Sequence, residues 1–336
     1  MSRSVSQTLR QHLFSRLCDG RFHSGSELAR SANVTRSAVW KAMQQLRSMG
    51  AQVQAVTHRG YKLESPTAAL DATQITELLG PECQGIGVEV AWSLESTNLA
   101  LLGRPVPTPG EIQVLLAEYQ RAGRGRRGRR WLAPLGGGLC MSIATGFTEL
   151  PPDVSALSLA MGVCVLRGLE RLQLTHARLK WPNDIVADAG KIGGILLELR
   201  AESGGPAHVV VGIGLNVKLG PLTVAEVQDN GTTPADLASL GAEPQARNAL
   251  AAAVIAECAG GLREFARAGF APFIAQWSAA DALRDRAVVV SGGSSGNSQL
   301  AGVARGVDAR GALLLATADG LQPIVAGEVS LRANVS

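Results

Sequence analysis

The chain has 336 residues, of which 46% are hydrophobic, 18% charged and only 4% aromatic. This length predicts two or three domains with a sizeable core, and the composition excludes a globally disordered chain. No apolar run approaches the roughly 18–20 residues of a membrane span, and no signal-peptide stretch stands at the N-terminus. The five cysteines form no CxxC pair and the histidines no cluster with metal-ligand spacing. We therefore expect reduced thiols, a cytoplasmic location, no membrane partner and no structural metal.

Positive charge is concentrated near the N-terminus. Residues 1–63 hold ten Lys and Arg against two carboxylates, a net charge of +8, whereas the whole chain carries +4. The rest of the chain therefore carries −4. A basic unit on a mildly acidic body predicts a polyanion partner for the first unit alone.

The basic unit has the signals of two short helices and a hairpin. Ser24 and Glu27 stand at the capping-box interval, which predicts a helix ending near residue 31. Thr35 predicts the start of a second helix that Gly50 ends. Alternating residues over 53–63 predict the hairpin. In the second helix, the residues at the spacing of one buried face are Val39, Met43 and Leu46.

The opposite face of the second helix is polar. Its donors, with one flat aromatic, suit phosphates and base edges; they are Thr35, Arg36, Ser37, Trp40, Lys41, Gln44 and Gln45. Arg59 lies at the basic hairpin tip. These features predict a winged helix-turn-helix whose second helix enters a major groove. The alternative is a basic three-helix scaffold for protein contact.

Beyond a proline-containing linker at Glu64–Thr67, apolar runs alternate with helical stretches, which favours an α/β or α+β domain. The runs are Val88–Ala91, Ile112–Ala117, Leu139–Ala144, Ile192–Leu199 and Val209–Leu215, and the helical stretches are Ser155–Leu172 and Asn248–Ala266. From Arg286 onward, short apolar runs separated by Gly, Ser and Asp predict a small barrel.

A loop rich in arginine and glycine follows the second of these runs. Residues 121–130 contain six arginines. Gly123, Gly125 and Gly128 satisfy GxGxxG, but Trp131 and Pro134 follow where a dinucleotide-binding fingerprint would open a helix, so that interpretation fails. Arginine forks grip phosphates and carboxylates, and therefore an anionic reacting group is a natural guest. Taken alone, the loop is equally well explained as a solvated basic loop or a second nucleic-acid patch.

Further polar residues stand at strand ends downstream. The residue before a proline favours extended backbone, so Lys180–Asp184 predicts a strand–turn–strand corner that presents Lys180, Asn183 and Asp184. Lys191 opens a buried strand beside two glycines, and Asn216 ends another. Cys140 lies within a buried run, where a covalent role is disfavoured.

Together these segments resemble the bifunctional biotin–protein ligases that also repress the biotin operon. The resemblance rests on residues 22–63, GRGRRGRRW at 123–131, KWPND at 180–184, residues 191–199, GIGLN at 212–216 and Gly327–Arg332, in order along the chain. It implies a multidomain fold: a winged helix-turn-helix over 1–64, an α/β (α+β) ligase domain with a mixed sheet over 65–282, and an SH3-like barrel over 283–336.

The resemblance also assigns roles to residues. Biotin would be bound by Ser96, Thr97, Asn98, Gln120, Arg124, Gly125, Arg126 and Lys191. ATP or the adenylate would be bound by Trp131, Asn183, Asn216 and Arg332, and Arg126, Lys180, Asp184 and Lys191 would carry the catalytic chemistry. One departure is that residues 217–237, which in the family close over the adenylate with apolar and aromatic residues, contain no Trp, Tyr or Phe here. Val224 and Val227 are the candidates for that contact.

The implied activity is ATP-dependent formation of biotinyl-5′-AMP, with Mg²⁺ accompanying ATP, and transfer of biotin to a lysine of the biotin carboxyl carrier protein of acetyl-CoA carboxylase. The implied regulator is a homodimer that forms with bound adenylate and binds operator DNA of biotin biosynthesis genes. The chemistry suits the residues, because cations stabilise charge that develops on a phosphate. Two alternatives stay open: a lipoate or octanoate ligase, and a non-catalytic regulator that senses a metabolite.

Overall fold

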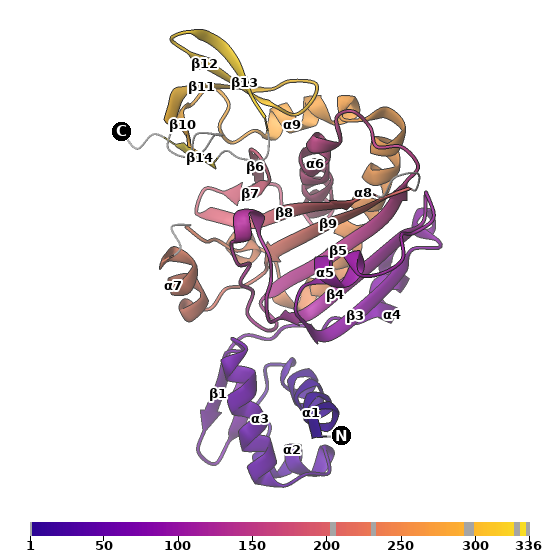
Figure 1. Ribbon diagram of the computed structural model, residues 1–336. Coiled ribbons are helices and arrows are strands. Elements are labelled where there is room, and N and C mark those ends of the chain that lie inside the picture. The colour runs from indigo at the N-terminus through magenta and orange to yellow at the C-terminus, as the bar shows by residue number, and fades with distance from the viewer. Residues whose placement is uncertain (1, 202–205, 230–232, 292–298, 326–329, 334–336) are drawn as a thin grey trace.

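The computed structural model describes residues 2–201, 206–229, 233–291, 299–325 and 330–333. Three units follow one another along the chain: a small helical unit, a large sheet with helices, and a small antiparallel sheet (Figure 1). Within the described part of the chain, no helix is both long and apolar enough to cross a bilayer.

The N-terminal unit is the expected winged helix-turn-helix. Its elements are α1 (Ser2–Leu17), α2 (Gly25–Ser31), α3 (Arg36–Ser48), β1 (Val53–Val56) and β2 (Gly60–Leu63). Ser24 and Thr35 cap α2 and α3 by accepting from the backbone N–H groups three residues on. Helix α1, which the sequence pattern did not predict, supplies Phe14 to the core of this unit.

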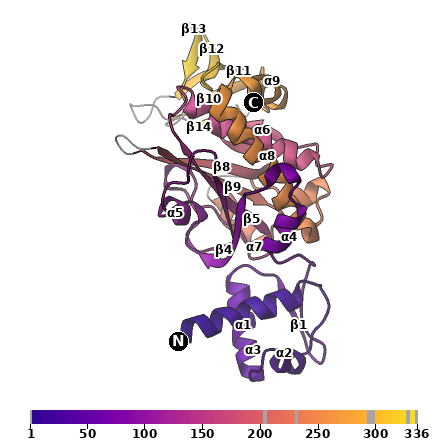
Figure 2. The same cartoon turned by 90° about the vertical axis from the view of Figure 1, so that its right-hand side faces the viewer.

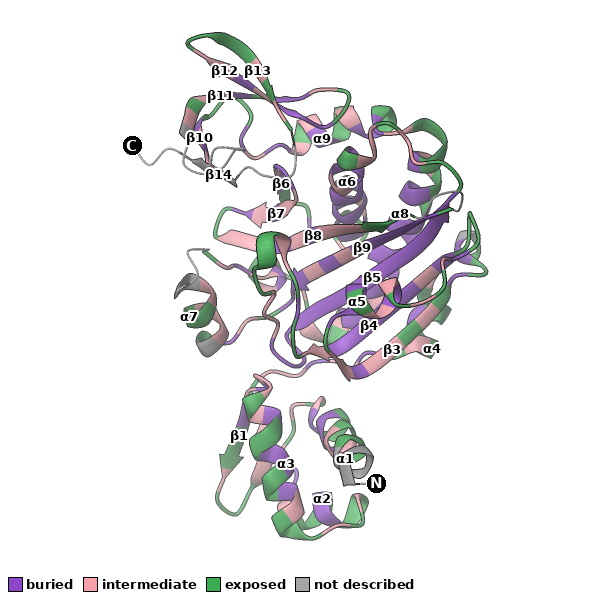
Figure 3. Cartoon of the chain, in the orientation of Figure 1, coloured by how far each residue is buried: buried purple, intermediate pink, exposed green. Residues whose placement is uncertain are grey.

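The central unit is a seven-stranded mixed sheet of order β3-β4-β5-β9-β8-β7-β6, in which only β3 and β4 are parallel. Strands β5 and β9 lie in the middle and are largely buried (Figure 3). The strands are β3 (Gly87–Leu94), β4 (Ile112–Gln120), β5 (Gly138–Phe147), β6 (Arg178–Lys180), β7 (Asp184–Ala187), β8 (Gly190–Arg200) and β9 (Ala207–Asn216).

Helices cover both faces of this sheet. Helices α6 (Leu157–Glu170) and α8 (Arg247–Ala268) lie on one side, and α5 (Thr97–Leu102) lies on the other (Figure 2). The remaining helices are α4 (Ala72–Leu78), α7 (Pro221–Asp229) and α9 (Ile274–Ala280). Single 3₁₀ turns occur at Pro81–Cys83, Arg126–Gly128, Val154–Ala156, Leu237–Leu240, Pro244–Ala246 and Ala271–Phe273.

The C-terminal unit is an antiparallel sheet of order β13-β12-β11-β10-β14. Its strands are β10 (Ala287–Ser291), β11 (Gln299–Val307), β12 (Leu313–Thr317), β13 (Gly320–Ile324) and β14 (Ser330–Ala333). The unit is hydrogen-bonded to the central one, since the indole Nε1 of Trp181 donates to the Gly311 carbonyl at 3.0 Å. Trp181 is fully buried there, at the KWPND corner.

The connection between the first two units is held by a buried ion pair. Arg247 on α8 contacts Glu118 on β4 at 2.7 Å, and both side chains are almost completely buried. Arg247 also donates to the carbonyls of Ala68 and Gly138, while Glu118 accepts from the Leu70 N–H. Because removing either partner would leave a buried charge unpaired, this pair fixes the linker to the sheet.

Candidate functional site

The Arg–Gly loop, residues 121–130, folds as a short hairpin. The Trp131 N–H donates to the Gly123 carbonyl at 2.9 Å, and the Gly125 N–H donates to the Arg129 carbonyl at 2.7 Å. A single 3₁₀ turn forms the tip, where Arg127 has a left-handed φ of 58°. No helix follows GxGxxG, which confirms that the dinucleotide-binding interpretation fails.

Arg126 at this tip points to the KWPND corner. Its Nη1 donates to Asn183 Oδ1 at 3.3 Å. Burial lowers the pKa of Arg126 below its usual value, the neighbouring Arg127 lowers it further, and Asp184 opposes the shift. The guanidinium is thus partly withdrawn from water beside a carboxylate, a setting in which it can hold a further anion.

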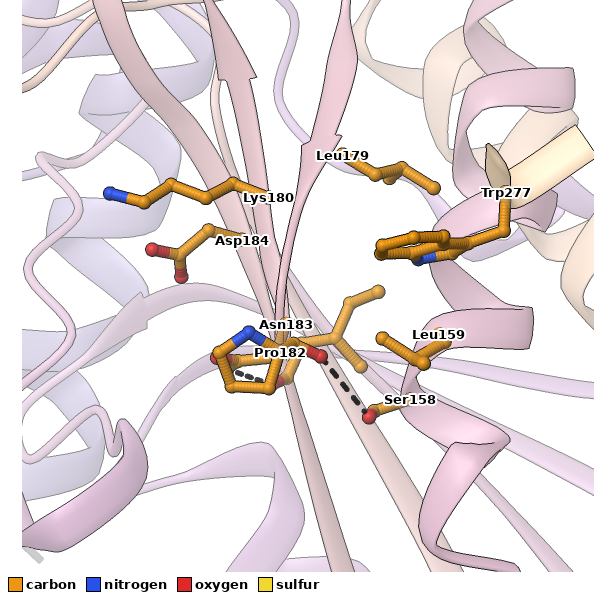
Figure 4. Close-up of a pocket in the computed structure, with 10 residues that line it drawn as sticks. Ser158, Leu159, Leu179, Lys180, Pro182, Asn183, Asp184 and Trp277 are labelled. Carbon is orange, nitrogen blue, oxygen red and sulfur yellow. Dashed lines mark hydrogen bonds between the residues drawn. The ribbon is translucent and has the colours of Figure 1, made fainter. Parts of the chain in front are cut away.

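KWPND is the turn of the β6–β7 hairpin, as expected, with Lys180 paired across to Asp184. The side chains of Lys180 and Asp184 extend together to one side of the hairpin (Figure 4). Leu179 and Trp277 lie on the other side (Figure 4). A small pocket at this corner is lined by both groups, the polar Lys180, Asn183 and Asp184 and the apolar Leu159, Leu179 and Trp277.

Lys191 and Asp184 form the tightest ion pair of the site. Lys191 Nζ lies 2.6 Å from Asp184 Oδ1, and each side chain is about a quarter exposed. The same ammonium lies 5.9 Å from the centroid of the Trp131 ring. The structure thus brings together Arg126, Trp131, Asn183, Asp184 and Lys191 from three separate segments.

The Asn216 side chain hydrogen-bonds to the protein backbone. Its Nδ2 donates to the carbonyls of Lys191 at 3.3 Å and Ala235 at 2.9 Å. The Lys191 N–H in turn donates to the Thr233 carbonyl. The chain that returns from α7 is therefore fixed beside Lys191. Val224 and Val227, the expected contacts of this segment, both lie on α7 and are half-buried.

A second polar group lies where α5 begins. Ser96 is the N-cap residue of α5, and Thr97 and Asn98 are buried. Gln120 Oε1 accepts from the Thr97 N–H at 2.8 Å and lies 3.2 Å from Thr97 Oγ1. The structure brings these predicted residues together at the start of the Arg–Gly loop.

Two glycines of GIGLN make room for these groups. A Cβ on Gly212 would lie 2.3 Å from Asn98 Oδ1, and one on Gly214 would lie 2.4 Å from the Trp131 indole. Beside the indole, burial raises the pKa of the Cys140 thiol to about 11. A neutral thiol is a poor nucleophile, which agrees with the absence of a covalent role.

Arg332 lies on β14 of the C-terminal unit. Its backbone pairs with Val289 in the β10–β14 ladder, but its side chain lies outside the described residues. Among the described residues, no group of three or more His, Cys, Asp and Glu could hold a metal ion.

The predicted DNA-binding residues are all exposed in the N-terminal unit. Those on or beside α3 are exposed, and the Trp40 side chain is 53% exposed although it is large and apolar. The exposed residues are Thr35, Arg36, Ser37, Trp40, Lys41, Gln44 and Arg59. The Arg59 guanidinium lies 4.0 Å above the Phe22 ring, which orders the tip of the wing.

Sequence reasoning missed two polar residues at this site. Ser142 on β5 and Glu198 on β8 both contact Asn98. The only signal was a hydroxyl and a carboxylate within otherwise apolar runs, and that pattern alone does not say what they face.

Comparison with known proteins agrees with this organisation. Residues 10–62 match the HTH domain family, 90–216 the Biotin/lipoate A/B protein ligase family and 290–332 the Biotin protein ligase C terminal domain. The chain is 36% identical to the bifunctional ligase/repressor BirA of Escherichia coli over 95% of this chain and 96% of that protein. It is 31% identical to the biotin--[acetyl-CoA-carboxylase] ligase of Mycobacterium tuberculosis over 75% of this chain and 92% of that one.

The fold is similar to that of a solved ligase. The biotin protein ligase of Aquifex aeolicus, solved with biotin and ATP, superposes with a TM-score of 0.61 at 25% identity. The match covers 74% of this chain and 99% of that one. The chain therefore belongs to the biotin–protein ligase family, among the bifunctional ligase/repressors that carry an N-terminal DNA-binding domain.

Proposed function

We propose that this chain activates the carboxylate of biotin with ATP and transfers the biotinyl group to a lysine of the biotin carboxyl carrier protein of acetyl-CoA carboxylase. The observation that carries the proposal is the convergence of Arg126, Asp184 and Lys191 at one site, beside a separate polar group around Thr97 and Gln120. The group around Thr97 and Gln120 can hold a neutral polar head group, and the cations Arg126 and Lys191 can hold a pair of anions.

In this assignment the polar group at the start of α5 binds the biotin ring system, and Lys191 holds its carboxylate. The biotin-binding residues are Ser96, Thr97, Asn98, Gln120, Arg124, Gly125, Arg126 and Lys191. Burial of Thr97 and Asn98 supports the assignment, because buried polar groups that lose their partners discriminate strongly for a matching ligand.

The first step is attack of the carboxylate oxygen on the α-phosphorus of ATP, with pyrophosphate leaving. Two anions must meet, and Arg126, Lys180 and Lys191 supply fixed positive charge for that encounter. Asp184 is the carboxylate that would hold the Mg²⁺ accompanying ATP, and that ion would offset charge on the phosphates. Trp131, Asn183 and Asn216 would bind the adenylate, and Arg332 is assigned to it on the family resemblance.

The second step is attack of the carrier lysine on the mixed anhydride, with AMP leaving. The enzyme needs no nucleophile of its own, which fits the neutral Cys140 thiol. The anhydride has to be sheltered from water until the carrier arrives. The hairpin of the Arg–Gly loop, which carries Arg126 at its tip, is the candidate for this shelter.

Transfer of radiolabelled biotin to an apo carrier domain, with lipoate and octanoate as competitors, tests the substrate. We expect biotin alone to be transferred; transfer of lipoate or octanoate in its place would favour the related ligase activity. Release of pyrophosphate from ATP upon addition of biotin separates an enzyme from a regulator that only senses a metabolite.

The N-terminal unit supports the second activity, repression of biotin biosynthesis genes. A single winged helix makes few phosphate contacts, so specific operator binding needs two copies on paired half-sites. We propose that biotinyl-5′-AMP promotes the homodimer, which makes ligand and DNA binding reciprocally coupled. Promoter affinity should rise with biotin and ATP present. Equal affinity with and without them, at matched salt and protein concentration, would refute the coupling.

Domain limits at 1–64, 65–282 and 283–336 are supported by the end of β2 at Leu63 and the start of β10 at Ala287. A cytoplasmic location is supported by the five cysteines, which form no disulfide with one another.

A further inference from the structure

Glu198 on β8 contacts two of the proposed biotin-binding residues, Asn98 and Arg124. Its Oε2 accepts from Asn98 Nδ2 at 2.8 Å, and its Oε1 lies 2.9 Å from Arg124 Nη1. The Glu198 side chain is 19% exposed and that of Arg124 is 44% exposed. The carboxylate therefore joins the buried start of α5 to the open Arg–Gly loop.

The contacts of Asn98 continue inward from Glu198. Asn98 Nδ2 also donates to the Leu196 carbonyl at 3.2 Å, and Asn98 Oδ1 accepts from the Ser142 hydroxyl at 2.5 Å. The whole amide group is thus engaged, and its orientation is fixed. Ser142 Oγ is completely buried on β5 and lies 2.6 Å from Thr97 Oγ1.

Thr97 closes the path, because it contacts Gln120 through both its N–H and its hydroxyl. Gln120 and Arg124 stand four residues apart at the start of the Arg–Gly loop. These contacts link six side chains in a path from Gln120 to Arg124, and the backbone from residue 120 to residue 124 closes the path into a loop, which we call the polar ring: Gln120, Thr97, Ser142, Asn98, Glu198 and Arg124. It joins β4, α5, β5 and β8 around the proposed biotin-binding group.

We propose that Glu198 is a positioning residue that closes the polar ring and holds the Arg–Gly loop against the biotin subsite before biotin binds. This inference rests on the proposed function, since it takes the residues around Thr97 and Gln120 as the biotin subsite. The ring arranges these groups in advance, and biotin binding then costs less ordering of the loop. Glu198 itself acts through Asn98 and Arg124.

The ring makes Glu198 responsible for biotin affinity more than for the chemical step. Glu198→Ala removes both contacts, whereas Glu198→Gln keeps the shape and an acceptor for Asn98 but removes the charge facing Arg124. Glu89→Ala is the matched control, because Glu89 forms an ion pair with Arg104 at 2.6 Å on the edge strand β3, outside the ring.

Two measurements on the full chain test the proposal. Trypsin cleavage within residues 121–130, mapped by mass spectrometry without biotin, reads the closure of the loop. We expect cleavage at least threefold faster in Glu198→Ala and unchanged in Glu89→Ala. Biotin titration followed by calorimetry should give a Kd at least tenfold higher in Glu198→Ala, an intermediate Kd in Glu198→Gln, and a kcat at saturating biotin within threefold of wild type.

The cleavage rate tests whether the polar ring exists, and the biotin Kd tests whether the ring shapes the biotin subsite. Cleavage in both Glu198 variants at the wild-type rate would overturn the ring. Faster cleavage with an unchanged biotin Kd would show that the ring exists but does not shape the biotin subsite, which overturns the proposed role. A double variant Glu198→Ala/Arg124→Ala should lose less biotin affinity than the two single losses combined, because both substitutions remove the Glu198–Arg124 contact. Fully additive losses would contradict the pairing.

Discussion

Lys191 Nζ lies 2.6 Å from Asp184 Oδ1, although the two residues occupy neighbouring strands and neither is fully buried. The pair fixes an ammonium where the carboxylate of biotin and the phosphate of ATP would have to meet. Without an anionic ligand the carboxylate of Asp184 holds the ammonium in place, and a substrate anion can then share it.

Lys191→Ala should therefore lose most of the first step and keep the fold, because one partly exposed lysine side chain contributes little to the core. Pyrophosphate release with biotin should fall by about 10²–10³, the cost of losing one electrostatic donor. The control is Arg305→Ala, which breaks an exposed ion pair with Asp285 in the C-terminal unit and should leave the rate unchanged. A loss below about fivefold for Lys191→Ala would contradict the role.

Arg126→Gly should still form the adenylate but release it early. The variant loses the guanidinium that contacts Asn183 at 3.3 Å from the loop tip, so the loop no longer holds the anhydride. We expect biotinylation of bystander lysines on added serum albumin, measured by streptavidin blotting. An adenylate retained as long as in the wild-type protein would rule out this function of the loop.

Arg36→Ala/Lys41→Ala should separate the two activities. Both side chains are exposed on α3, which lies in the N-terminal unit, apart from strands β7 and β8 of the ligase site (Figure 1). Biotin transfer should stay at the wild-type rate, while operator binding is lost and its dependence on salt becomes shallower, as expected when phosphate contacts are removed. Gel shifts at several salt concentrations, beside a transfer assay, measure both. Reduced biotin transfer in this variant would show that the surface also serves the ligase.

Buried thiols should make the fold sensitive to alkaline pH. Burial raises the pKa of Cys164 to about 12, from 9.0 in an exposed thiol. Between pH 9 and pH 12 the unfolded state releases this proton and the folded state keeps it, so the free energy of unfolding falls as pH rises. The slope is about 1.4 kcal/mol per pH unit for each such thiol. Urea titrations from pH 8 to 10.5 should show a shallower fall in Cys164→Ala; identical slopes would contradict the burial effect.

Local sequence signals predicted the parts of the fold that depend on neighbouring residues. Ser24 and Thr35 cap the helices they were expected to cap, because a cap uses backbone groups three residues away. The strand–turn–strand corner at KWPND also formed as expected, because a proline restricts the backbone of the residue before it. The sequence patterns did not predict helix α1, whose apolar residues show only weak helical spacing, or strand β13, which has few apolar residues.

The candidate site was predictable as separate segments, and its internal contacts were not. Glu198 meets Arg124 only because β8 and β9 align across the sheet and the Arg–Gly loop folds back over them. Ser142 looks like one polar residue in an apolar strand until β5 places it under α5. Such pairings depend on strand register between distant segments, which no local pattern encodes.

Mass spectrometry of an apo biotin carboxyl carrier domain, incubated with the protein, ATP, Mg²⁺ and biotin, tests whether this chain makes biotinyl-5′-AMP and transfers its acyl group to a carrier lysine. We expect one added biotinyl group on one lysine, dependent on ATP and abolished or strongly slowed by Lys191→Ala. A carrier of unchanged mass after incubation with folded wild-type protein would contradict it.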